Sequence, residues 1–188
     1  IKSPAFFSSL TISLSNLVWR VLILSFCGKI VAGIYFASFA IGSLPGTLFN
    51  NSFGPPMLKK NLKIKYLDIF KFFSYLIIIF LLFISLSYKD QIFYDNQFTQ
   101  IFGTAISLVG AIFMIKGQYY RQFIIQKTKY KSKLFNYDVI YSIIICLIVP
   151  ILFLIGGINL IIISFLISSL LSFTMYKLIY MNLVNLKK

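Results

Sequence analysis

Six long apolar stretches follow one another along the chain, and they constrain its fold more than any other feature. They run from about residue 4 to 27, 30 to 57, 66 to 88, 98 to 117, 138 to 155 and 158 to 180. A helix needs about 20 apolar residues to cross roughly 30 Å of hydrocarbon. The runs are continuous rather than alternating, which favours helices over barrel strands. We therefore expect an all-α polytopic membrane protein, with six transmembrane helices in one bundle that spans residues 1–188.

The composition agrees with a lipid environment. Of the 188 residues, 59% are hydrophobic and 12% are charged, whereas a soluble domain is about a quarter charged. A water-soluble globule of this size has too little interior for so much apolar surface. Soluble enzymes, disulfide scaffolds and disordered tails are therefore excluded. Cys27 and Cys146 lie within apolar runs, where they are predicted to act as small buried hydrophobes.

The cations predict how the bundle is oriented. Most of the 18 Lys and Arg residues fall on one side of a six-span arrangement, whereas Lys29 and Lys89 fall on the other and Arg20 lies within the first span. Because Lys and Arg mark cytoplasmic loops, we expect both termini in the cytoplasm. The stretch 119–135 mixes basic and aromatic residues and is predicted to lie along anionic lipid headgroups. Nucleic-acid binding is the much weaker alternative, and no nucleic-acid partner is expected.

A polar stripe on the first span is the strongest candidate for a site. Its members, spaced four, three, four and seven residues apart, are Ser9, Ser13, Asn16, Arg20 and Cys27. At 100° per residue they fall within an arc of about 60°. A polar stripe on a membrane helix should face protein or a water-filled cavity. We therefore predict that Ser9, Ser13, Asn16 and Arg20 line a substrate cavity.

Arg20 is the main residue of this candidate site, because its planar guanidinium suits phosphate. Two alternatives remain open. Its long side chain could reach the headgroups beyond the end of the span, or it could pair with a group on another polypeptide.

The second span is rich in small residues, which let helices pack closely. Its candidate packing and hinge residues are Gly33, Tyr35, Pro45 and Gly46. Packing is the favoured interpretation, and a hinge at Pro45–Gly46 is the alternative. Tight turns are expected at Gly28–Lys29 and at Gly156–Gly157. Two further seams of small residues, one at 103, 107 and 110 and one at 164, 168 and 172, are predicted helix contacts.

Nothing in the sequence indicates catalysis. The chain has no His and no Glu, and its four carboxylates are Asp68, Asp90, Asp95 and Asp138. None of them is placed within a span, and Asp138 is predicted at a helix N-terminus, where its charge suits the helix dipole. We therefore expect no enzyme activity, no catalytic residue, no metal, no cofactor, and no ion-coupling carboxylate inside the bundle.

The segment from Leu14 to Leu58 carries a family resemblance. It reads LSNLVWRVLILSFCGKIVAGIYFASFAIGSLPGTLFNNSFGPPML. It resembles the start of the second half of polysaccharide and O-antigen flippases, which belong to the multidrug/oligosaccharidyl-lipid/polysaccharide exporter superfamily. Gly156-Gly157-Ile158, leading into a Ser-rich last helix, is also similar to that group.

The resemblance implies that the chain is the C-terminal half of a transporter whose N-terminal six-helix bundle is missing, and we expect a piece also because it begins with Ile1. The implied activity is export of a lipid-linked, polyprenyl-pyrophosphate oligosaccharide by alternating access across a bacterial inner membrane, in the synthesis of lipopolysaccharide or another surface polysaccharide. Arg20 would bind the pyrophosphate. The alternatives are another multidrug or lipid-precursor transporter of the superfamily, and a membrane-embedded transferase of lipid or polysaccharide synthesis.

Overall fold

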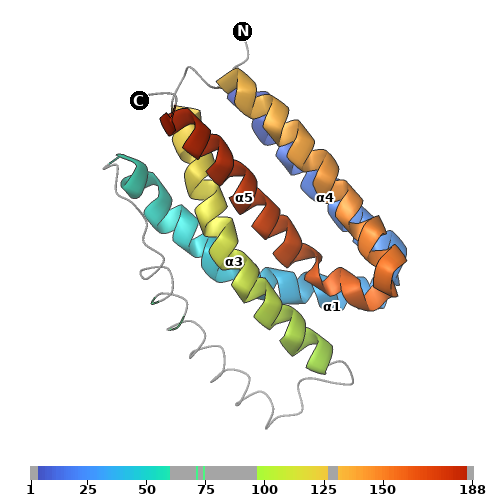
Figure 1. Cartoon of the computed structure of the whole chain (residues 1–188). Coiled ribbons are helices and arrows are strands. Elements are labelled where there is room, and N and C mark those ends of the chain that lie inside the picture. The colour runs from blue at the N-terminus through green and yellow to red at the C-terminus, as the bar shows by residue number, and fades with distance from the viewer. Residues whose placement is uncertain (1–3, 60–70, 72–73, 75–96, 127–130, 186–188) are drawn as a thin grey trace.

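The computed structural model describes residues 4–59, 71, 74, 97–126 and 131–185. It consists of α1 (Pro4–Lys59), α3 (Gln97–Gln126), α4 (Lys131–Leu160), the short 3-10 helix η2 (Ile161–Ile163) and α5 (Ser164–Asn185) (Figure 1). The predicted all-helical class is confirmed for this part of the chain. The predicted third span, 66–88, lies outside the described residues apart from two isolated positions, and so do Asp68, Asp90 and Asp95.

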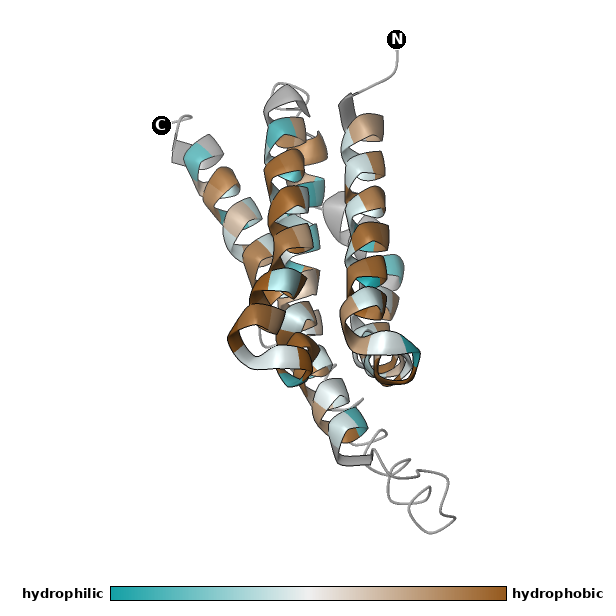
Figure 2. Ribbon diagram, turned by 90° about the vertical axis from the view of Figure 1, so that its right-hand side faces the viewer, coloured by the Kyte–Doolittle hydropathy of each residue, from teal (hydrophilic) through white to brown (hydrophobic). Residues whose placement is uncertain are grey.

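The described helices have the character of membrane spans. Three of them are long and apolar enough to cross a membrane, over Phe6–Phe49, Thr99–Ile125 and Leu134–Asn182. Large apolar side chains are exposed along the outer faces of α1 and α4, among them Leu14, Val18, Ile143 and Leu154. Figure 2 shows that apolar residues recur along the whole length of these helices. This is the pattern expected where the surrounding solvent is lipid.

Two glycine turns break the longest helices. Gly28 has φ 72° and ψ 170°, and Gly157 has φ 66° and ψ −157° after a non-helical Gly156. Only glycine adopts this region of backbone space readily. The turns predicted at both places are confirmed, and Figure 1 shows them at the same end of the molecule, opposite the start of α1 and the end of α5. Gly28 divides α1 into a first segment, residues 4–27, and a second segment, residues 29–59.

The helices associate as two pairs. The first segment of α1 lies along α4, which we call the α1–α4 pair, and α3 lies along α5, which we call the α3–α5 pair (Figure 1). The second segment of α1 packs on α3. Direct contact between α3 and α4 is slight. A buried apolar core fills the end near the glycine turns and includes Trp19, Ile23, Phe39 and Ile161.

Small residues bring α3 close to its neighbours, as predicted for the seam at 103, 107 and 110. A Cβ at Gly103 would lie 2.8 Å from the Ile162 side chain, and one at Gly110 would lie 2.9 Å from Phe165. At Ser107 of the same seam, a Cβ at Gly42 of α1 would lie 2.3 Å from the Cβ of Ser107. Such approach gains dispersion contacts where lipid provides no hydrophobic driving force between helices.

Two helix boundaries differ from those predicted, and both change the environment of charged residues. α3 continues past Gly117 to Gln126, so Arg121 lies in a packed helix and is buried. α4 begins at Lys131, about two turns before Asp138. The prediction that Asp138 starts a helix is therefore wrong. Hydropathy favours a loop over the polar residues before Asp138, whereas α4 includes them.

Candidate functional site

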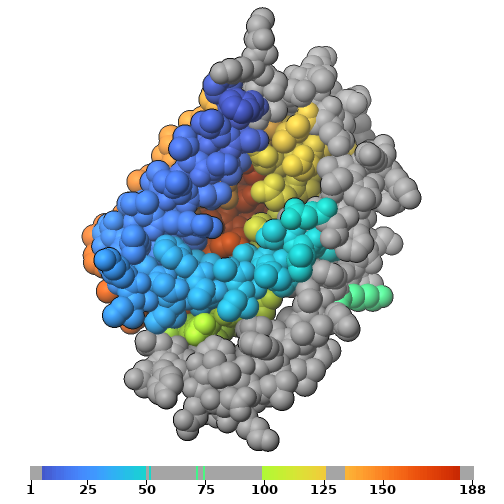
Figure 3. All heavy atoms as spheres, turned by 180° about the vertical axis from the view of Figure 1, so that it is seen from behind, coloured from blue at the N-terminus to red at the C-terminus, as the bar shows by residue number. Residues whose placement is uncertain are grey.

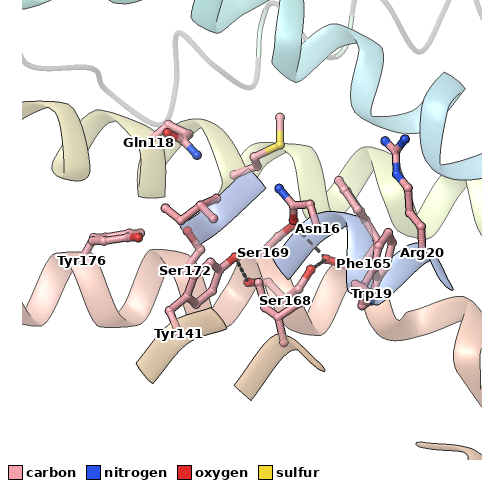
Figure 4. Close-up of a pocket in the computed structure, with 13 residues that line it drawn as sticks. Asn16, Trp19, Arg20, Gln118, Tyr141, Phe165, Ser168, Ser169, Ser172 and Tyr176 are labelled. Atoms are coloured by element: carbon pink, nitrogen blue, oxygen red, sulfur yellow. Dashed lines mark hydrogen bonds between the residues drawn. The ribbon is translucent and has the colours of Figure 1, made fainter. Parts of the chain in front are cut away.

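A cavity of about 200 Å³ opens between the two helix pairs. Figure 3 shows the hollow between the first segment of α1 and α3, with α5 at its floor. The first segment of α1 contributes Ile12, Asn16, Trp19 and Arg20, α3 contributes Met114 and Gln118, α4 contributes Tyr141 and Ile145, and α5 contributes Phe165, Ser168, Ser169, Ser172 and Tyr176. In Figure 4, Arg20 and Tyr176 lie at opposite ends of this cavity.

The lining mixes polar and apolar side chains and carries one sign of charge. Arg20 is the cation among the lining residues, and none of them is a carboxylate. A cleft lined by a single sign of charge within low-dielectric walls concentrates counter-ions. The cavity is therefore electrostatically suited to an anion. Within the described residues Arg20 forms no ion pair, and its side chain is exposed at the edge of the hollow.

Most hydroxyl groups of the cavity already donate to the backbone. The Oγ atoms of Ser168 and Ser169 each donate to the carbonyl oxygen of Phe165 at 2.8 Å, and Tyr141 donates to the carbonyl oxygen of Ser168 at 3.3 Å. These bonds are drawn in Figure 4. The donors left for a ligand include the guanidinium of Arg20, the amides of Asn16 and Gln118, and the indole N–H of Trp19, which has no hydrogen-bond partner among the described residues.

The predicted cavity residues divide into two groups. Asn16 and Arg20 line the cavity, whereas Ser9 and Ser13 are exposed on the same side of α1 but are not part of the lining. Ser15, which the polar stripe omitted, is buried, and its carbonyl oxygen lies 4.0 Å from the Sγ of Cys146.

The predicted packing and hinge residues differ in whether they are buried. Tyr35 is 1% exposed, and it donates a 3.0 Å hydrogen bond to the carbonyl oxygen of Ile158, just after the second glycine turn. Pro45 and Gly46 are buried, and Gly46 faces Ala111 and Met114 of α3. Gly33 is exposed, with open space around it among the described residues. The backbone remains helical through Pro45, since Gly28 is the position in α1 with non-helical angles.

A buried polar network lies at one end of the cavity, and we call it the polar clasp. Its members are Ser8 of α1, Arg121 of α3, Asp138 of α4 and Tyr176 of α5. The Nη2 of Arg121 lies 3.1 Å from Asp138 Oδ2 and 2.8 Å from Ser8 Oγ. Tyr176 donates to Asp138 Oδ1 at 2.5 Å, and Ser8 donates to Asp138 Oδ2. All three donors converge on one carboxylate, which is 0% exposed.

The clasp is electrostatically neutral as a unit. Removing two charges from water costs free energy. Their mutual attraction offsets this cost only when good hydrogen bonds satisfy the remaining donor and acceptor groups of both side chains. Asp138 has such bonds on both oxygens, while the Nε of Arg121 is buried without a partner. Tyr176 belongs both to the clasp and to the cavity wall, so it connects the two.

The clasp is not predicted from the sequence, although its two charged residues both lie beside apolar residues. Arg121 stands in a run of aromatic and aliphatic residues, and Asp138 is an isolated acid directly before a long apolar run. Charges so close to apolar runs are candidates for mutual pairing. Their spacing along the chain does not identify the partner, because the bond joins two helices.

Comparisons of the chain with models of protein families, with curated proteins and with solved structures find no match. In the described part of the chain, no three potential metal-ligand side chains come together. The functional argument therefore depends on the cavity and its chemistry.

Proposed function

We propose that the chain is part of a transmembrane exporter that moves a lipid-linked oligosaccharide, bound by its anionic pyrophosphate head, by alternating access. The observation that carries this proposal is a partly polar cavity whose lining has one guanidinium and no carboxylate, within a bundle whose outer faces are apolar. A guanidinium fork binds phosphate oxygens in pairs. A charged side chain within the hydrocarbon raises the free energy of insertion, so such residues are rare there and mark functional sites.

The length of the described helices supports the six-span arrangement. The runs Phe6–Phe49 and Leu134–Asn182 contain 44 and 49 residues, about twice what one crossing requires. Each contains a glycine turn near its middle. We propose that each crosses the membrane twice, that Thr99–Ile125 crosses once, and that residues 66–88 form the remaining span. Both ends of the chain then lie on the same side, which the excess of Lys and Arg would make cytoplasmic in a bacterial inner membrane.

The size of the cavity limits what it can hold. About 200 Å³ is less than the roughly 300–1,000 Å³ of pockets that enclose drug-sized ligands. We propose that it holds the phosphate head alone, while the isoprenoid remains in lipid and the sugars extend through the open face. Ser9 and Ser13 are exposed on the same side of α1 as Arg20. Their exposure favours a second helical bundle, such as the N-terminal bundle of the resembling family, as the cover of this face.

Two observations bear on the alternatives. A cation-coupled drug antiporter needs a carboxylate free to bind a cation, whereas the charge of Asp138 is matched by Arg121. A transferase needs a nucleophile or a general base next to its substrate, whereas the chain has no His or Glu and the cavity lining has no carboxylate. Both observations favour a flippase.

The test compares Arg20→Gln with Lys29→Gln in cells that depend on this protein for surface polysaccharide. Lys29 is exposed beside the first glycine turn and does not line the cavity, so it is the matched control for loss of one positive charge. A hydrogen bond to a charged group contributes about 1.5–3 kcal/mol, so we expect Arg20→Gln to reduce export at least about tenfold. Equal export by both variants at normal protein levels would remove Arg20 from the site.

Binding is measured separately on the purified protein. Trp19 is the single tryptophan of the chain and lines the cavity, so its fluorescence reports directly on occupancy. Farnesyl diphosphate serves as the probe. We expect a saturable change in emission that Arg20→Gln weakens and Lys29→Gln leaves unchanged, and no such change with farnesol, which lacks the phosphates.

A further inference from the structure

The two helix pairs are joined at their two ends by different means. At one end the chain itself connects them. Gly28 leads from the first segment of α1 into the second segment, which packs on α3, and Gly156–Gly157, near the end of α4, lead through η2 into α5. At the other end the polar clasp connects them. Ser8 and Asp138 belong to the α1–α4 pair, whereas Arg121 and Tyr176 belong to the α3–α5 pair. Figure 1 shows both glycine turns at the same end.

The cavity lies between these two connections. Its lining includes residues of both pairs, from Arg20 toward the turns to Tyr176 at the clasp (Figure 4). Direct packing of α3 on α4 is slight. Near the turns, by contrast, the pairs share an apolar core that includes Trp19, Phe39 and Ile161. At the clasp end the pairs share a smaller apolar cluster, which includes Ile124 of α3, Leu134 of α4 and Ile179 of α5. Within the described residues, the clasp is the ionic connection between the pairs at that end.

We propose that the polar clasp is a releasable latch: when it opens, the α1–α4 pair swings about the glycine turns and widens the cavity between the pairs. A turn can act as a hinge when a few residues absorb the change in backbone angles. Gly28 and Gly157 already occupy angles that other residues avoid. The proposal does not depend on which ligand the cavity binds.

The position of the clasp lowers the free-energy cost of opening it. The polar–aromatic side chains of Tyr120, Tyr137 and Tyr180 and the exposed amide of Gln122 lie on neighbouring turns of the same helices. Tyrosines gather where a membrane helix meets the headgroups. Water at this level can replace the hydrogen bonds of Arg121 and Asp138, which hydrocarbon at mid-bilayer could not.

The experiment measures distances between spin labels in the full chain, reconstituted in lipid nanodiscs with Cys27→Ala and Cys146→Ala. One label pair, at Gln122 of α3 and Asn136 of α4, reports across the helix pairs. The control label pair, at Gln122 and Asn182 of α5, reports within the α3–α5 pair; all three positions are exposed. Each label pair is measured with the clasp intact, with Tyr176→Phe, and with the double substitution Arg121→Gln/Asp138→Asn.

We expect the clasp variants to shift the distance between α3 and α4 to longer values, by more than the width of the original distribution. The distance between α3 and α5 should not change. An unchanged distance between α3 and α4 would overturn the proposal. Equal broadening of both distances would also overturn it, because the clasp would then be general packing rather than a latch. If the double variant does not fold, Tyr176→Phe, which keeps the ion pair, decides by the same criteria.

Discussion

Tyr176 donates its phenolic O–H to Oδ1 of Asp138 at 2.5 Å, and this bond links a wall of the cavity to a buried ion pair. Tyr176 is 1% exposed and Asp138 is 0% exposed. A residue that lines the candidate binding site therefore also holds the two helix pairs together.

The buried ion pair gives the first prediction. Asp138→Asn leaves Arg121 charged and uncompensated inside the bundle, and we expect it to lower the free energy of unfolding by about 3–5 kcal/mol. The double variant Arg121→Gln/Asp138→Asn removes both charges and should recover much of that loss. Unfolding is followed in detergent by heat or by SDS titration. If the double variant is no more stable than Asp138→Asn, the two charges do not compensate each other.

The close approach of α1 to α3 gives the second prediction. A Cβ at Gly42 would lie 2.3 Å from the Cβ of Ser107 and 2.8 Å from the carbonyl oxygen of Thr104, so Gly42→Ala must move one helix. We expect a loss of about 1–3 kcal/mol in unfolding free energy. Gly33→Ala is the matched control, because Gly33 lies in the same helix segment with open space around it. It should be neutral or stabilising by up to about 1 kcal/mol. The same loss for both variants would contradict the helix contact at Gly42.

The first glycine turn gives the third prediction. Gly28 has φ 72° and ψ 170°, with nothing within 4 Å of a Cβ placed there. Gly28→Ala therefore costs backbone strain rather than a steric clash, and we expect a loss of about 1–3 kcal/mol. Thermal unfolding measures this. No loss would mean that the backbone at residue 28 differs from the one described.

Much of the fold could be predicted from the sequence, because lipid imposes strong local rules. The continuous apolar runs identified helices, and the Gly28 and Gly156–Gly157 positions identified the turns, since both signals are local. The helix ends near Gln126 and Lys131 could not be predicted, because the helices continue through polar residues beyond the apolar runs, with Arg121, Ile124 and Leu134 buried nearby. Hydropathy marks the hydrocarbon boundary, whereas a helix ends where its packing ends.

The candidate site was only partly predictable. Helical periodicity placed Asn16 and Arg20 on one face, and both line the cavity. The same periodicity also predicted that Ser9 and Ser13 line the cavity, although both are exposed and outside the lining. It did not identify Ser8, which is buried. Periodicity gives the direction of a side chain from its own helix but not the position of the neighbouring helices. Asp138 and Arg121 were missed for the same reason.

The most direct test is whether the face of α1 that carries Asn16 is in contact with water inside the membrane. A single cysteine is placed at Asn16 or, as the control, at the apolar exposed position Val18, with Cys27 and Cys146 replaced by Ala. Both variants are treated with a membrane-impermeant thiol reagent in sealed, oriented membranes from either side. A water-filled cavity predicts labelling of Asn16→Cys, slowed by farnesyl diphosphate, and no labelling of Val18→Cys. Equal labelling of both positions, or labelling of neither, would contradict a polar cavity within the bundle.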